Sequence, residues 1–167
     1  MSTITNGLAI AQEFIGCVET RDREGIERLL HPKARQVFVL NADPSHPSGV
    51  FERKDEVLAY TFGLFGKFDS LAWVDKDWTV SADGGRVFLQ AQSEGVASHS
   101  KAPYRNTYVI RFDIAGERIV QILEYALDDV FLALGTPPGD WDKRAVALAR
   151  TLPYSTVADP SLVGSGN

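Results

Sequence analysis

The sequence has little cysteine, no excess of basic residues and few histidines. Cys17 is the only cysteine in 167 residues, which excludes an intramolecular disulfide framework and leaves too few thiols for a thiolate metal cluster. The 22 acidic residues outnumber the 17 basic ones, and the net charge of -5 argues against nucleic acid as the main partner. Three histidines spread over three loops do not form a metal-ligand spacing. We therefore expect no metal site and no nucleic-acid partner.

Targeting and membrane-spanning segments are also absent from the sequence. The first seven residues contain no cationic stretch followed by an apolar core, so they do not resemble a signal peptide. No apolar run reaches the roughly 18 residues that a membrane-spanning helix requires. We expect a cytoplasmic protein in a reducing compartment, without a membrane partner.

Helical periodicity appears in three stretches of the first 70 residues. The composition, 44% hydrophobic and 23% charged, is typical of a globular domain. Apolar residues three and four positions apart predict helices over 8–18, 22–30 and 53–67. A further helix is predicted over 140–152, before a small and polar end. We expect one domain over 1–136, then a C-terminal helix and flexible tail over 137–167.

Strand patterns fill the second half of the chain. Runs rich in Val, Ile, Phe and Tyr predict strands over 36–40, 70–80, 86–96, 104–114 and 118–126. The Pro- and Ser-rich segment 41–49 is either a lid over a pocket or a surface loop. Successive hairpins imply an antiparallel sheet, and the helices need one face to pack on, so the predicted class is α+β. A strongly curved sheet closed by helices leaves a cavity of the kind that binds small ligands.

Two carboxylates, an amide and a phenol are embedded in these strands. If Glu94 and Glu124 share an apolar cavity, desolvation raises their pKa values and repulsion holds one proton between them, which supplies an acid and a base. Tyr108 can then stabilise charge on a substrate oxygen, and Asn106 can position the substrate. The alternatives are a solvated Glu94 on the outer face and an ordinary buried tyrosine at 108.

The side of the sheet that Glu124 occupies depends on the turn at residues 115–117. A three-residue loop places Glu124 with Asn106, Tyr108 and Ile110, whereas a two-residue turn places it with the arginines of the preceding strand. We expect the first arrangement, because it gathers apolar and neutral polar residues around the acid. Both arginines then lie outside.

Several aromatic residues are candidate walls for the cavity. We assign Trp73, Phe38 and Phe62 to substrate binding, together with Gln92 and the loop residue His99, whose intrinsic pKa suits proton transfer. A core position for the aromatic residues and a solvated position for His99 are the alternatives. Trp73 and Trp78 lie an odd number of residues apart, which places them on opposite faces unless a bulge intervenes.

A family resemblance joins these features. The segment 104–112, a glycine turn and the segment 117–125 resemble the nuclear transport factor 2-like superfamily, in its SnoaL-like polyketide cyclase and ketosteroid isomerase branch. Members often carry a Tyr-x-Asn-x-Tyr-Val strand, a Gly-Lys-Ile-Val-like start to the final strand, and an acidic-aromatic pair near its end. The order of elements over 6–134 is similar as well. The resemblance implies a cone-shaped, cystatin-like α+β barrel, commonly a homodimer, with a deep pocket for a small apolar organic ligand and no cofactor.

Three functions follow as expectations from this resemblance. The first is a small-molecule isomerase, cyclase or lyase that acts on a polyketide-, steroid- or terpenoid-like substrate, with Glu124 and Glu94 as titrating groups. The second is a noncatalytic ligand-binding or dimerisation module of the same fold. The third is an epoxide hydrolase, because limonene epoxide hydrolase carries acids at what look like the matching positions. Gln92 stands where that hydrolase has an arginine. SnoaL-type cyclases use a His and Asp pair, for which His99 is the candidate.

Overall fold

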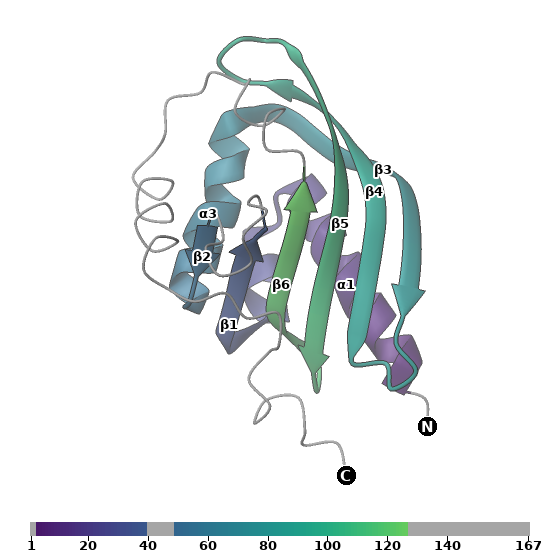
Figure 1. Cartoon of the computed structure of the whole chain (residues 1–167). Helices are drawn as coiled ribbons and strands as arrows, with labels where there is room; N and C mark the ends of the chain where they lie inside the picture. Colours follow the sequence, from purple (N-terminus) through teal and green to yellow (C-terminus); the bar gives the residue numbers. More distant parts are fainter. Residues whose placement is uncertain (1–2, 40–48, 127–167) are drawn as a thin grey trace.

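The computed structural model describes residues 3–39 and 49–126, which form three helices and six strands (Figure 1). In chain order these are α1 Thr3–Thr20, α2 Arg23–Leu29, β1 Leu30–Phe38, β2 Gly49–Phe51, α3 Lys54–Lys67, β3 Phe68–Val80, β4 Arg86–Ala97, β5 Pro103–Ala115 and β6 Arg118–Ala126. All three helices predicted in the first 70 residues and all five predicted strands are present. The short β2 was missed, because its three residues follow a segment rich in turn-forming residues.

Some predicted features lie outside the described residues. These are most of the lid or loop segment, over 41–48, the C-terminal helix with its tail, and the domain boundary after residue 136.

The six strands form one open, mixed sheet in the order β2-β1-β6-β5-β4-β3. Neighbouring strands are antiparallel except β1 and β6, which are parallel. The α+β class and the curved sheet are confirmed, while the expectation of a purely antiparallel sheet is wrong. In Figure 1 the sheet bends around α1 and α3, which lie against one face. We call this helix-covered face the inner face. No helix in the described ranges is long and apolar enough to cross a membrane.

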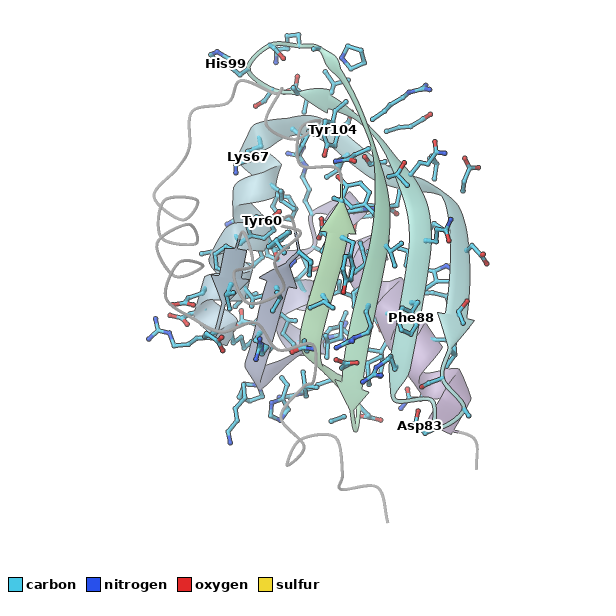
Figure 2. The ribbon with its side chains drawn as sticks, in the orientation of Figure 1. Tyr60, Lys67, Asp83, Phe88, His99 and Tyr104 are labelled. Atoms are coloured by element: carbon cyan, nitrogen blue, oxygen red, sulfur yellow. The ribbon has the colours of Figure 1, made fainter. Side chains whose placement is uncertain are left out.

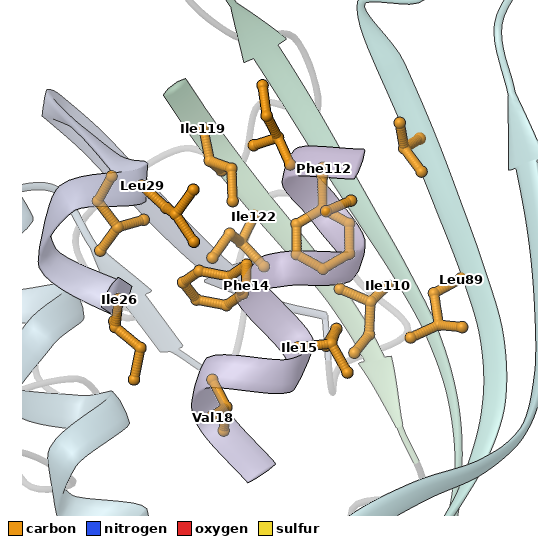
Figure 3. Close-up of a cluster of buried hydrophobic side chains, with 14 of the residues drawn as sticks. Phe14, Ile15, Val18, Ile26, Leu29, Leu89, Ile110, Phe112, Ile119 and Ile122 are labelled. Atoms are coloured by element: carbon orange, nitrogen blue, oxygen red, sulfur yellow. The ribbon is translucent and has the colours of Figure 1, made fainter. Parts of the chain in front are cut away.

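The core lies between the inner face and the helices. Phe14 and Ile15 of α1 lie next to Phe112 and Ile110 of β5 (Figure 3), and Val18 belongs to the same buried cluster. The ring centroids of Phe14 and Phe112 are 5.9 Å apart in an edge-to-face arrangement. Each buried side chain of this kind stabilises the fold by roughly 1.5–3 kcal/mol. The three-and-four spacing of α1 therefore serves to hold the helix against the sheet.

The start of α2 follows from local chemistry. Asp22 caps this helix, because its Oδ1 accepts a hydrogen bond from the backbone N–H of Gly25 at 3.0 Å. The helix ends at Leu29, and the chain continues directly into β1 through His31 and Pro32. The second predicted helix is thus confirmed, with its end shortly before the proline.

An irregularity in β3 changes the side on which a tryptophan lies. Trp73 pairs with Ser93 and Trp78 pairs with Leu89, and the register shifts by one residue between these pairs. Asp75, at the shift, has a positive φ of 52°. The bulge brings both tryptophans to the inner face, Trp73 buried and Trp78 partly buried against the core. The odd spacing would place them on opposite faces only in a regular strand.

Candidate functional site

The β5–β6 hairpin decides where the candidate acid lies. Ala115 pairs with Arg118, so the turn has two residues, Gly116 and Glu117, and Gly116 has a φ of 60°. The predicted three-residue loop is therefore wrong. The register then shifts by one residue after Ile114. An extra residue in β6 restores the alternation that a longer loop would have given.

As a result, Glu124 pairs with Ile110 on the inner face, as expected. Its neighbours there are Tyr108, next along the same face of β5, and Phe38 of β1, which pairs with Glu124 across the parallel ladder. Both β5 arginines lie on the outer face, as expected: Arg105 is exposed there, whereas Arg111 is buried beside Asp113. The inner-face position predicted for Glu124 is thus correct, but it results from the register shift in β6 and not from a three-residue loop.

Burial is the reason that Glu124 is chemically distinctive. Removal of its carboxyl group from water raises the pKa to about 8. The residue as a whole is partly exposed, although its carboxyl group is buried. At neutral pH most of the molecules carry a protonated Glu124, and a minority carry the carboxylate. Such a group can both give and take a proton near cellular pH.

A hydrogen-bonded group of polar side chains lies beside this acid on β5. The hydroxyl oxygens of Tyr104 and Tyr108 are 2.8 Å apart, and Asn106 Nδ2 donates to the Tyr104 hydroxyl at 2.9 Å. The three residues alternate along one strand, so all three point to the inner face and all are buried. Figure 2 shows Tyr104 near the upper end of β5, close to α3. Ser93 Oγ accepts a hydrogen bond from the backbone N–H of Asn106 at 3.1 Å, which connects the group to β4.

The two phenols keep their protons. Desolvation raises the pKa of both Tyr104 and Tyr108, and the nearby charge of Glu124 raises them further. The hydrogen bonds that join Tyr104 to Tyr108 and to Asn106 act in the opposite direction on the pKa of Tyr104. Neutral phenols in this position are hydrogen-bond donors and not bases. They can therefore stabilise negative charge on a nearby oxygen.

Aromatic and polar side chains surround this group on the inner face. Trp73 contacts Tyr108 with ring centroids 6.1 Å apart, and Phe38 contacts Tyr60 of α3 at 4.5 Å. Tyr60 is labelled in Figure 2 between β1 and α3. Within the described residues, the Trp73 Nε1 donor and the Gln36 Oε1 acceptor are buried without a hydrogen-bond partner. We refer to Glu124, Tyr104, Tyr108, Asn106, Trp73, Phe38, Tyr60 and Gln36 as the inner-face site.

Glu94 does not belong to this site. It pairs with Arg105 across the β4–β5 ladder, and Arg105 Nη2 lies 3.2 Å from Glu94 Oε1 in an ion pair. The Arg105 side chain is 77% exposed and the Glu94 side chain is 54% exposed. Gln92 is exposed on the same outer face. The expectation that Glu94 and Glu124 share a cavity is therefore wrong. The sequence of β4 indicates this outward position, because the apolar residues Val87, Leu89 and Ala91 occupy the inner face. The residues that alternate with them, such as Gln92 and Glu94, therefore face outward.

Two other predicted residues lie away from the inner-face site. His99 is exposed in the turn between β4 and β5, and Figure 2 shows it at the tip of that hairpin. Phe62 is on α3, where its ring lies 4.9 Å from the guanidinium carbon of Arg23 and 6.0 Å from the ring of Phe65. Phe62 is partly buried against the core cluster that also contains Tyr108, and its ring contacts are with Phe65 and Arg23. In residues 3–39 and 49–126, no three His, Cys, Asp or Glu side chains are placed to hold a metal ion.

Tyr104, Tyr60 and Gln36 were missed from the sequence. Tyr104 shares the even-numbered alternation of Asn106 and Tyr108, which was sufficient to include it. Tyr60 and Gln36 reach the site only through the packing of α3 and β1 against the sheet, and no local pattern indicates that contact.

Comparison with known proteins agrees with this architecture. The profile of the SnoaL-like domain matches residues 11–122, more than half of the chain. No curated protein shows significant sequence similarity.

Solved structures share the fold at low identity. A proposed isomerase from Bacillus subtilis superposes with a TM-score of 0.70 at 19% identity, over 81% of this chain and 96% of that protein. A proposed SnoaL-like polyketide cyclase from Jannaschia sp. CCS1 superposes with a TM-score of 0.66 at 20% identity, over 83% of this chain and 98% of that protein. A third structure is a protein of ketosteroid isomerase-like fold from Catenulispora acidiphila, solved in complex with trimethylamine. It superposes with a TM-score of 0.61 at 14% identity, over 79% of this chain and 95% of that protein. With the profile match, these likenesses identify the chain as a member of the SnoaL-like family, with the nuclear transport factor 2-like fold.

Proposed function

We propose that the protein is a small-molecule enzyme of the isomerase, cyclase or lyase type, which moves a proton on a largely apolar carbonyl compound. The observation that carries this proposal is the position of Glu124, a carboxyl group of pKa about 8 on the inner face beside the Tyr104–Tyr108 hydrogen bond. Glu124 is the titrating group. Glu94 has no part in the reaction.

The mechanism follows from the protonation states at this site. In its ionised form Glu124 takes a proton from the carbon next to the carbonyl group, which produces an enolate. One phenol of the Tyr104–Tyr108 pair donates its hydrogen bond to the enolate oxygen, where the negative charge develops, while the other phenol donates to its partner. Protonated Glu124 then returns the proton to the same carbon or to another one. Return to another carbon isomerises the substrate, and attack of the enolate on a second carbonyl closes a ring.

The surroundings of Glu124 support an apolar substrate. Phe38 and Trp73 offer aromatic surface on the same face, and the polar groups that remain are few and close to the acid. A hydrolase that opens epoxides with two acids is not favoured, because the second carboxylate lies on the outer face in an ion pair.

Proton exchange tests the proposal before the natural substrate is known. The protein is incubated in D2O with a panel of cyclic and linear ketones, and deuterium uptake at carbon is followed by mass spectrometry. At least one ketone should exchange faster with protein than without it, and Glu124→Gln should abolish that acceleration. Glu94→Gln is the matched control, because it changes the same residue type on the other face of the sheet and should leave exchange unchanged.

Two outcomes would contradict the proposal. Exchange that persists in Glu124→Gln, or that is lost equally in Glu94→Gln, removes Glu124 from the reaction. Saturable binding of a ketone without any exchange would favour a noncatalytic ligand-binding module. The trimethylamine complex of the Catenulispora protein makes that second function worth the direct comparison.

A further inference from the structure

A groove of about 580 Å³ lies between α3 and the turn that joins α1 to α2. Its lining comes from Arg21 and Arg23 around the turn and from one side of α3, and it consists of Arg21, Arg23, Phe62, Gly63, Phe65 and Gly66. None of these residues belongs to the inner-face site. No acidic side chain is in this lining, although the chain as a whole carries a net charge of -5.

Two guanidinium groups lie over two phenyl rings in this groove. The Arg23 guanidinium carbon is 4.9 Å from the ring centroid of Phe62 and 5.9 Å from that of Phe65. The Arg21 guanidinium carbon is 5.7 Å from the Phe65 centroid. At these distances the cations are attracted to the ring faces. The groove therefore joins flat apolar surface to positive charge.

The two arginines differ in what they bind. Arg21 donates to backbone oxygens at the end of α3 and the start of β3, through Nη1 to Phe65 at 3.2 Å and through Nη2 to Phe68 and Asp69 at 2.8 Å each. Arg23 makes no ion pair or hydrogen bond with any of the described residues, and it is exposed. Its N–H donors are therefore available to a ligand.

Two glycines keep the groove open. A Cβ atom added at Gly63 or Gly66 would meet nothing within 4 Å, so packing within the described residues does not require glycine at either position. Glycine inside a helix costs about 1 kcal/mol relative to alanine. The missing side chains leave free space beside the rings of Phe62 and Phe65, where a flat group can lie.

We propose that this groove binds a small aromatic carboxylate. The guanidinium carbon of Arg23 lies over the phenyl rings, and its N–H donors can form the paired hydrogen bonds that a carboxylate accepts. The aromatic body of the ligand lies against Phe62 and Phe65, over the glycine positions. The proposal is independent of the reaction proposed for Glu124, since the two sites share no residue.

Calorimetric titration with 1-naphthoate and with the neutral 1-naphthalenemethanol tests this site. At constant ionic strength the carboxylate should bind about tenfold tighter or more, as a charge-assisted pair predicts. Arg23→Gln should remove that preference. Arg105→Gln is the matched control, because it removes an exposed arginine from the outer face of β5 and should change the affinity less than about twofold.

Two further variants locate the bound probe. Gly63→Leu should abolish binding of both compounds, because its side chain fills the open space, while circular dichroism confirms that the protein stays folded. Glu124→Gln should leave the affinity for naphthoate unchanged. The proposal is overturned if the wild-type protein shows no saturable binding, if Arg23→Gln binds as the wild type does, or if Arg105→Gln or Glu124→Gln loses as much affinity as Arg23→Gln.

Discussion

The hydroxyl oxygens of Tyr104 and Tyr108 lie 2.8 Å apart on the inner face of β5, two positions along the same side of the strand. Both phenols are buried, so their hydroxyl groups take hydrogen-bond partners from the protein in place of water. Asn106, between them in sequence, donates to the Tyr104 oxygen and extends the hydrogen-bonded pair to a third side chain.

Loss of one hydroxyl should therefore cost stability through its partner. We expect Tyr104→Phe to lower the free energy of unfolding by about 1–2 kcal/mol, because the Tyr108 hydroxyl and the Asn106 amide lose the oxygen that both of them contact. Urea denaturation of Tyr104→Phe, Tyr108→Phe and the double variant measures this. A coupling energy of about 0.5–1.5 kcal/mol is expected from the cycle, and strictly additive effects would contradict a direct bond.

The raised pKa of Glu124 predicts a pH dependence of stability. In the unfolded chain this carboxyl titrates near 4.5 and in the folded protein near 8. Between these values the unfolded chain binds fewer protons, so the free energy of unfolding falls as the pH rises from about 4.5 to about 8 and levels off above. The full shift corresponds to an upper limit of about 5 kcal/mol, and the partial exposure of Glu124 reduces it.

The measurement is a series of urea denaturations between pH 5 and pH 9 on the wild type and Glu124→Gln. Glutamine does not titrate, so the difference between the two proteins isolates the contribution of this group. The wild type should lose stability relative to Glu124→Gln as the pH rises through this window. A constant difference would show that the carboxyl titrates at its ordinary pKa.

The fold was predictable because its signals are local. Three-and-four spacing gave the helices, and β-branched and aromatic runs bounded by glycine gave the strands to within two or three residues over β3 to β6. The parallel pairing of β1 with β6 was not predictable in this way. It depends on the path of the chain after β1, and no local pattern reports which distant strands become neighbours.

The faces of the sheet were harder to predict, because single extra residues reverse them. The bulge in β3 brings Trp78 to the side of Trp73, and the register shift in β6 returns Glu124 to the side of Tyr108 after a two-residue turn. Neither irregularity has a clear sequence signal. Glu94 is different, because regular alternation along β4 already places it with Gln90 on the outside.

A close approach between two strands gives a third prediction. A Cβ atom at Gly95 of β4 would lie 2.5 Å from the backbone oxygen of Ser70 in β3, which cannot move without breaking the ladder. We expect Gly95→Ala to destabilise the protein by about 1–3 kcal/mol. Gly16→Ala in α1 is the matched control, because its Cβ would meet nothing within 4 Å and it should stabilise the helix by roughly 0.5–1 kcal/mol. Thermal denaturation should show shifts of opposite sign, and equal shifts would refute the contact.

A buried carboxylate on the outer face of the sheet gives the last prediction. Asp113 is 2% exposed and accepts hydrogen bonds from Arg86 Nε at 2.8 Å and from Arg111 Nη2 and Gln121 Nε2 at 2.9 Å each. Asp113→Asn keeps the shape of the side chain but removes the charge. The new amide group would also point N–H donors at the donors of Arg86, Arg111 and Gln121. We expect a loss of about 3–5 kcal/mol, because Arg111 is itself buried and loses this counter-charge.

The control for Asp113 is an aspartate that forms its ion pair with a lysine at the surface. Asp69 lies 2.6 Å from Lys101, and their side chains are 45% and 68% exposed, so Asp69→Asn should cost less than about 1 kcal/mol. Urea denaturation at neutral pH compares the two variants. The two losses of stability should differ because water can solvate Lys101 after its partner is lost, whereas Arg111 is buried and has little access to water. Similar losses in both variants would mean that the Asp113 cluster is solvated in solution, and the outer face of β5 and β6 would then be open to water at this point.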